Sequence, residues 1–184
     1  MLRLAAFALA AATAAAASAA DLETVATFGA DRPLGNVAVG PDGRIFVSLH
    51  GFYGPPFQIA EVKLDGTAVA YPTPEWSASP DGTGPGLNGV LGLKTSADGI
   101  LWMLDGASTD HAGRLVGWDT KTETLHRVIY LAKPVIRDAV FLNDLAIDDA
   151  NNAIYISDTG NAETAALIVV DLDTGRARRV LEGS

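Results

Sequence analysis

Three asparagine residues open three similar segments of the chain, and their side chains could hold a ligand or a metal ion. Asn36, Asn88 and Asn143 lie 52 and 55 residues apart, and each precedes a short apolar stretch. An asparagine side chain carries one carbonyl acceptor and two N–H donors, so several of them together could coordinate Ca²⁺ or orient a hydroxyl or carbonyl group. The alternative is that each amide bonds to backbone at a turn.

A second set of polar residues ends the next apolar stretch of each segment. These residues are His50, Asp105 and Asp158. If the two stretches form a hairpin, the chain returns to the end where it began, so these side chains should lie near the asparagines. A histidine or carboxylate placed there could act as a general base. We therefore take His50 and Asp158 as candidate catalytic residues, together with Asp144, the carboxylate that follows Asn143. The alternative is that these are solvated polar residues of turns.

Aromatic residues follow His50 in a turn-rich stretch. Phe52 and Tyr53 lie in the segment 51–57, which is rich in Gly and Pro. Loops between strands often carry recognition residues. The two rings could therefore contact a flat or cationic ligand. The alternative is that they pack between elements of the core.

The elements that must position these residues repeat about every 54 residues. Each segment has an apolar stretch, a turn carrying Asp-Gly or Asn-Asn, and a second apolar stretch with a central aromatic residue. The aromatic residue recurs at Phe46, Trp102 and Tyr155. Two further short stretches follow in each segment. Four antiparallel strands in such a repeat are typical of a β-propeller blade, whereas a β-sandwich has no regular four-strand period.

The repeat predicts an all-β domain organisation. We expect a signal peptide at 1–20 and the N-terminal half of a six-bladed β-propeller at 21–184, with blades at about 30–75, 85–131 and 138–182. Propellers have 4–8 blades, so three blades would not close a ring. The full-length protein is then expected to be a monomer. The alternative is a three-bladed chain that dimerises into a six-bladed ring.

Composition and the first residues predict the compartment and exclude several functions. Arg3, the apolar run that follows it and the Ala17-Ser18-Ala19 pattern predict a signal peptide, and hence a secreted or periplasmic protein with no membrane attachment after cleavage. The chain has no Cys, which excludes a disulfide scaffold, a thiolate nucleophile and a Cys-ligated metal. Its net charge of −9 argues against a nucleic-acid partner.

Four segments together resemble the major royal jelly protein/yellow family, which is related in fold to the six-bladed regucalcin/gluconolactonase propellers. These segments are 34–50, 101–105, 141–148 and 154–160. The resemblance implies a secreted six-bladed propeller that binds or converts a small molecule at the mouth of its central channel. Relatives are linked to dopachrome conversion and to the binding of amines.

The resemblance also implies a candidate metal ligand. Asn143-Asp144 is similar to the Asn-Asp step that opens the corresponding strand in the lactonase propellers, where the Asn contributes to a divalent-metal site. It implies Asn143 as a candidate ligand for Ca²⁺ or Zn²⁺. The acidic ligand expected in the first blade is missing, because Leu34-Gly35-Asn36 occupies that stretch.

Three functions remain open at this point. The first is a royal-jelly/yellow type protein that binds or converts a small molecule, such as a dopachrome-tautomerase-related or an amine- or catechol-binding protein. The second is a metal-dependent, gluconolactonase-like lactone hydrolase. The third is a non-catalytic extracellular interaction module, since a fold does not fix a function.

Overall fold

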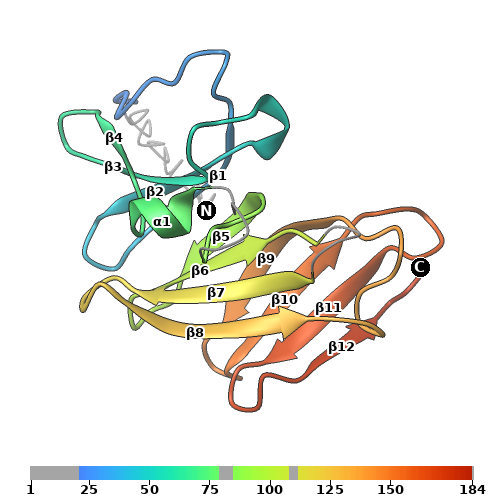
Figure 1. The fold of residues 1–184 in the computed structure, drawn as a ribbon. Coiled ribbons are helices and arrows are strands. Elements are labelled where there is room, and N and C mark those ends of the chain that lie inside the picture. Colours follow the sequence, from blue (N-terminus) through green and yellow to red (C-terminus); the bar gives the residue numbers. More distant parts are fainter. Residues whose placement is uncertain (1–20, 79–84, 108–111, 184) are drawn as a thin grey trace, which may run out of the picture.

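The computed structural model describes residues 21–78, 85–107 and 112–183, and nearly all regular structure in these ranges is β-strand (Figure 1). The strands form three antiparallel sheets of four strands, each built from four consecutive strands. The predicted all-β fold with four-stranded repeats is confirmed for these residues. It is consistent with part of a β-propeller, and the six-bladed ring stays a prediction. The predicted signal peptide at 1–20 lies outside the described residues.

The strands of each sheet follow one another in chain order. The first sheet contains β1 (Leu34–Val39), β2 (Ile45–Leu49), β3 (Ile59–Val62) and β4 (Ala68–Ala70). The second contains β5 (Val90–Thr95), β6 (Ile100–Asp105), β7 (Gly113–Asp119) and β8 (Thr124–Leu131). The third contains β9 (Leu142–Asp148), β10 (Ala153–Asp158), β11 (Ala166–Asp171) and β12 (Ala177–Val180).

Two short helices accompany the strands in the described residues. They are a 3₁₀ helix at Gly51–Tyr53 and the single-turn α1 at Pro74–Ser77. Thr73 begins α1, because its side-chain oxygen accepts the N–H of Trp76 at 3.3 Å. No helix in the part of the chain that the structure describes combines the length and apolarity needed to cross a membrane.

The first turn of each sheet carries a residue in the left-handed region, as the Asp-Gly and Asn-Asn signals predict. The φ angle is +83° at Gly43, +92° at Gly99 and +49° at Asn152. Gly adopts such angles at little cost, and Asn tolerates them better than most other residues. Asp42 supports its turn by accepting the N–H of Arg44 at 3.2 Å. The hairpin prediction is therefore confirmed at all three turns.

The three sheets spread outward from a common centre. Strands β1, β5 and β9 lie together in the middle of the molecule, and the last strand of each sheet lies farthest from them (Figure 1). Strand β5 contacts both β1 and β9. The centre is therefore where side chains from all three sheets can meet.

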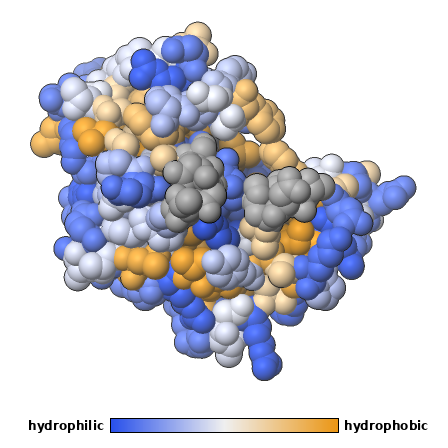
Figure 2. Space-filling model, in the orientation of Figure 1, coloured by the Kyte–Doolittle hydropathy of each residue, from blue (hydrophilic) through white to orange (hydrophobic). Residues whose placement is uncertain are grey.

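The middle sheet is covered on both faces, and its strands are accordingly apolar. Every residue of β6 is buried. Leu101 and Met103 pack toward the first sheet, whereas Trp102 and Leu104 pack toward the third. Successive side chains of a strand point to opposite faces, so a strand with two apolar faces has a continuous apolar sequence. Figure 2 shows one face of the molecule, where apolar side chains form separate patches among hydrophilic ones.

Arg44 joins the first two sheets at the ends of their strands. Its guanidinium donates to both carboxylate oxygens of Glu61, at 2.9 and 3.0 Å. It also donates to Glu123 of the second sheet at 2.7 Å. The other oxygen of Glu123 accepts the hydroxyl of Tyr71 at 2.9 Å and the indole N–H of Trp118 at 3.2 Å. A bidentate Arg–carboxylate pair fixes orientation as well as charge.

This ion pair predicts how stability depends on pH. The hydrogen bonds from Arg44 hold the pKa of Glu61 below its ordinary value of 4.5. A carboxyl group whose pKa is lower in the folded chain contributes stability above its unfolded pKa, and that stability is lost as the pH falls through the folded pKa. We expect the free energy of unfolding to decrease on acidification below about pH 4.5. Urea unfolding measured between pH 7 and pH 3 checks this.

Two variants isolate the contribution of Arg44. Arg44→Met should lower the free energy of unfolding at pH 7 by about 1–3 kcal/mol, because it leaves Glu61 without its main partner. It should also flatten the acid dependence. Arg32→Met is the matched control, since Arg32 is half exposed and lies 3.7 Å from the exposed Asp31. The interpretation would be wrong if Arg44→Met lost no more stability than Arg32→Met and kept the acid dependence of the wild-type chain.

Candidate functional site at the inner strands

One backbone hydrogen bond recurs where the second strand of each sheet ends, and it defines equivalent positions. The bonds run from His50 N to Pro33 O, from Gly106 N to Gly89 O, and from Thr159 N to Phe141 O, each at 2.9 Å. Three residues after the acceptor, the chain has Asn36 in β1, Gly92 in β5 and Asp144 in β9. The structural repeat therefore places an amide, a glycine and a carboxylate at equivalent points of the three inner strands.

The expected ring of three equivalent asparagines is wrong. Asn88 lies one residue before the recurring backbone acceptor, and Asn143 lies two residues after it. Asn88 donates its backbone N–H to Asp105 at 2.7 Å, and this bond fixes the segment that precedes β5. Register shifts interrupt the pairing of β1 with β2 and of β5 with β6. Spacing along the sequence therefore does not give the spacing around the centre.

The amide of Asn36 and the carboxylate of Asp144 meet across the middle sheet. Asn36 Nδ2 donates to Asp144 Oδ1 at 2.8 Å. The backbone N–H of Leu145 donates to the same oxygen at 2.8 Å. The described residues give Oδ2 no hydrogen bond, so this oxygen is the one that a ligand can use. The locked carboxylate thus presents one free acceptor.

Gly92 makes this meeting possible. A Cβ atom at Gly92 would lie 2.9 Å from the Cα of Asp144 and 3.1 Å from its Oδ1. A glycine within a strand often marks a close approach of another backbone. Any side chain at this position would push β9 away from β5. The hydrogen bond between Asn36 and Asp144 therefore depends on the absence of a side chain at Gly92.

Two serine hydroxyls on the second strands bond to the backbone of the inner strands. Sequence reasoning missed both. Ser48 pairs with Asn36 in register and donates to the carbonyl of Leu91 at 2.6 Å. Ser157 pairs with Asp144, and its Oγ accepts the backbone N–H of Asp144 at 3.1 Å. The signal was present in the sequence, because each serine lies two residues after the central aromatic residue of its strand.

A cleft of about 310 Å³ opens at these inner strands. Its lining residues are Gly35, Asn36, His50, Leu91, Phe141, Asn143 and Asp144. It therefore brings together four of the predicted site residues, from the first and third sheets. Asn88 and Asp158 do not line it.

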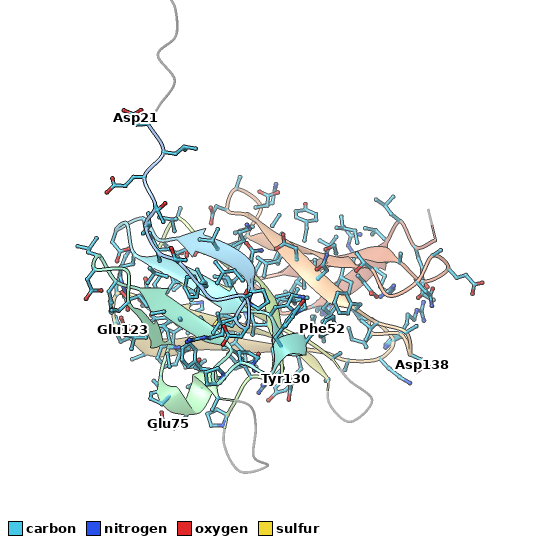
Figure 3. The ribbon with its side chains drawn as sticks, turned by 90° about the horizontal axis from the view of Figure 1, so that it is seen from above. Asp21, Phe52, Glu75, Glu123, Tyr130 and Asp138 are labelled. Atoms are coloured by element: carbon cyan, nitrogen blue, oxygen red, sulfur yellow. The ribbon has the colours of Figure 1, made fainter. Side chains whose placement is uncertain are left out.

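Exposed aromatic rings stand beside the cleft. The ring of His50 lies 4.6 Å from that of Phe52 and 5.7 Å from that of Tyr53. Phe52 in turn lies 6.1 Å from Phe141. Phe52 is 77% exposed and Tyr53 is 60% exposed, so neither fills the core. Figure 3 shows Phe52 where the first sheet approaches the third. Sequence reasoning did not single out Phe141.

The hydrogen bond that His50 accepts determines which ring nitrogen of the neutral imidazole carries the proton. Its Nδ1 accepts the N–H of Phe52 at 3.4 Å, which caps the 3₁₀ helix carrying both exposed rings. With the lone pair of Nδ1 occupied, the proton of the neutral ring sits on Nε2. In this tautomer Nε2–H is a hydrogen-bond donor that lines the cleft. The cleft thus combines an N–H donor on His50 with an acceptor oxygen on Asp144.

Asp158 has a structural role instead of the catalytic one expected. It is 2% exposed, accepts the backbone N–H of Phe141 at 2.9 Å and pairs with Arg179 at 2.8 Å. Asp105 occupies the same position in the second sheet and pairs with Arg114. Burial raises the pKa of Asp105, and Arg114 opposes this rise. Both carboxylates hold the segment that leads into the inner strand.

Among the residues that line the cleft, His50 and Asp144 are the two of the His, Asp and Glu types. Ca²⁺ takes six to eight oxygen ligands, and a catalytic zinc site uses three protein ligands. In the ranges that the structure describes, no three His, Asp or Glu side chains are grouped so that they could hold a metal ion. Asn143 lines the cleft beside Asp144, and its role as a ligand for Ca²⁺ or Zn²⁺ stays a prediction.

Comparison with known proteins shows a similarity of fold alone. No family model matches the chain, and no curated protein matches it. The chain is similar to the extracellular domain of a putative hybrid two-component system, BT4673 from B. thetaiotaomicron, with a TM-score of 0.55 and 15% identity over 82% of the chain. It covers 17% of that structure's length.

Two further solved structures are more distant. Kuenenia stuttgartiensis hydrazine synthase gives a TM-score of 0.49 and 12% identity, with 79% of this chain and 35% of that chain covered. Puromycin hydrolase gives a TM-score of 0.45 and 19% identity, with 79% of this chain and 20% of that chain covered. The chain thus spans a small part of each structure that it resembles.

The close approach at Gly92 generates a test on stability. Gly92→Ala should lower the free energy of unfolding by about 1–3 kcal/mol, because the new methyl group overlaps the backbone of Asp144. Gly89→Ala is the matched control, since a Cβ at Gly89 meets no atom within 4 Å. Chemical denaturation of the two variants and the wild-type chain measures the difference. Equal stability of the two variants would contradict the close approach.

Proposed function

We propose that this protein binds a small aromatic amine or catechol in the cleft at the inner strands. The observation that carries the proposal is the carboxylate of Asp144, locked by Asn36 and left with one free oxygen in a cleft bordered by exposed aromatic rings. Ligand sites combine apolar surface with a few placed polar groups, and this cleft has both. Its volume of about 310 Å³ suits a small ligand.

Each group has a defined part in binding. Asp144 Oδ2 would accept a hydrogen bond from an ammonium group or a phenolic hydroxyl, and charged partners make such bonds stronger. Phe52 offers a ring face for stacking or for a cation–π contact. His50 would donate from Nε2 to a ligand oxygen. The resemblance to the major royal jelly protein/yellow family supports the same ligand class.

The same residues could also convert a ligand by tautomerisation. Asp144 Oδ2 would take a proton from a ring carbon, the C–H electrons would form a new C=C bond, and the carbonyl oxygen would gain negative charge. His50 Nε2–H would stabilise that oxygen. The proton would then pass from Asp144 to the oxygen, so the step needs no external oxidant. This conversion of the dopachrome type is the catalytic form of the proposal.

Calorimetry with the full chain tests the proposal. Tyramine should bind, and 4-ethylphenol, which lacks the ammonium group, should bind at least about tenfold more weakly because it cannot pair with the carboxylate. Asp144→Asn should weaken tyramine binding by a similar factor and leave the binding of 4-ethylphenol nearly unchanged. Asp31→Asn is the control, since Asp31 is exposed and lies outside the cleft.

Two outcomes would overturn the proposal. One is an equal affinity for tyramine and 4-ethylphenol. The other is an Asp144→Asn variant that is folded, as judged by its thermal unfolding, and binds tyramine as the wild-type chain does.

A further inference from the structure

A second cleft lies between the second and third sheets, toward the opposite end of the inner strands. Its volume is about 240 Å³. One wall comes from β8, which contributes His126 and Arg127. Asp98 and Asp149 come from the turns that follow β5 and β9. Asp144 lies near the start of β9, so these turns are remote from the first cleft.

The basic wall of the second cleft is held in place by contacts between the sheets. Arg127 Nη1 donates to the carbonyl of Leu172, which follows β11. A Cβ atom at Gly175 would lie 2.9 Å from Arg127 Nη2, so the guanidinium rests against the backbone of the turn before β12. A guanidinium has five N–H donors, and the bond to Leu172 uses one of them. The remaining N–H groups can donate to the carboxylate of a ligand.

His126 stands next to Arg127 and adds a second donor. Its ring meets that of Trp102 edge to face, with centroids 5.9 Å apart and an interplanar angle of 86°. Trp102 is buried and rests on Gly117, where a Cβ atom would lie 3.0 Å from the indole ring. The tryptophan therefore gives His126 a fixed neighbour within the wall of the cleft.

Carboxylates on the two turns add negative charge to the cleft, opposite its basic wall. Asp98 accepts the hydroxyl of Ser96 at 2.5 Å, which orients its carboxylate in the turn between β5 and β6. Asp149 is exposed in the turn between β9 and β10. Among the described residues, no Lys, Arg or His side chain forms an ion pair with either carboxylate. The cleft thus has a basic wall and an acidic rim.

We propose that this second cleft binds a small zwitterion of the size of a free amino acid. Its carboxylate would lie at Arg127 and His126, and its ammonium group at Asp149 and Asp98. A ligand of one sign would leave the opposite charges of the cleft without a partner, whereas a zwitterion satisfies both. The volume of about 240 Å³ is below the roughly 300–1,000 Å³ of sites for drug-sized ligands, which favours a small molecule.

Ligands that lack one charge provide the test. Titration of the full chain with L-alanine, followed by NMR, should shift resonances of residues around the second cleft. L-alaninamide lacks the carboxylate and N-acetyl-L-alanine lacks the ammonium group. Each should bind at least about tenfold more weakly than L-alanine, because one end of the cleft is then unpaired.

Variants locate the site on the chain. Asp149→Asn should weaken the binding of L-alanine at least about tenfold and leave the fold intact, since its exposed carboxylate forms no ion pair. Arg127→Met should weaken the binding of L-alanine by a similar factor, because it removes the partner of the ligand's carboxylate. Asp31→Asn and Asp144→Asn should leave the binding of L-alanine unchanged, which separates this site from the first cleft.

Three results would overturn this inference. The first is that L-alanine causes no shift at millimolar concentration. The second is that the amide or the acetylated form binds as well as L-alanine. The third is that Asp149→Asn, with wild-type thermal stability, binds L-alanine as the wild-type chain does.

Discussion

The close approach of β9 to β5 at Gly92 is the constraint on which the first cleft depends. It lets the amide of Asn36 reach Asp144 across the strand between them, with a bond of 2.8 Å. That bond uses one carboxylate oxygen and leaves the other for a ligand. The equivalent positions of the three inner strands thus have different residues because each has a different role. Asn36 donates, Gly92 leaves space for the contact, and Asp144 accepts.

Charged groups elsewhere keep the three sheets in the positions that this contact requires. Arg44 links the first sheet to the second through Glu61 and Glu123. The buried pair of Asp158 and Arg179 holds the segment that carries Phe141 into the cleft. Breaking such a pair leaves a buried charge without a partner, which costs far more than losing a surface ion pair. The acidic residues at the ends of the second strands are therefore part of the scaffold.

Local features of the fold could be predicted from the sequence, whereas the register could not. Asp-Gly and Asn-Asn signals act within a few residues, and the turns at Gly43, Gly99 and Asn152 formed where they were expected. The position of His50 in one cleft with Asn36 and Asn143 followed from the hairpin geometry. The equivalence of Asn36 with Asp144 was missed, because register shifts in the strand pairs change which residue of each repeat lies at a given point of the inner strand. The burial of Asp158 was missed as well, because it depends on Arg179 from a distant strand.

The coupling between Asn36 and Asp144 tests the central contact most directly. A double-mutant cycle compares the free energies of unfolding of Asn36→Ala, Asp144→Ala, the double variant and the wild-type chain. If the two side chains are hydrogen-bonded across Gly92, the coupling energy should be about 0.5–3 kcal/mol. Additive effects, with a coupling below about 0.3 kcal/mol, would mean that the inner strands do not meet in this way.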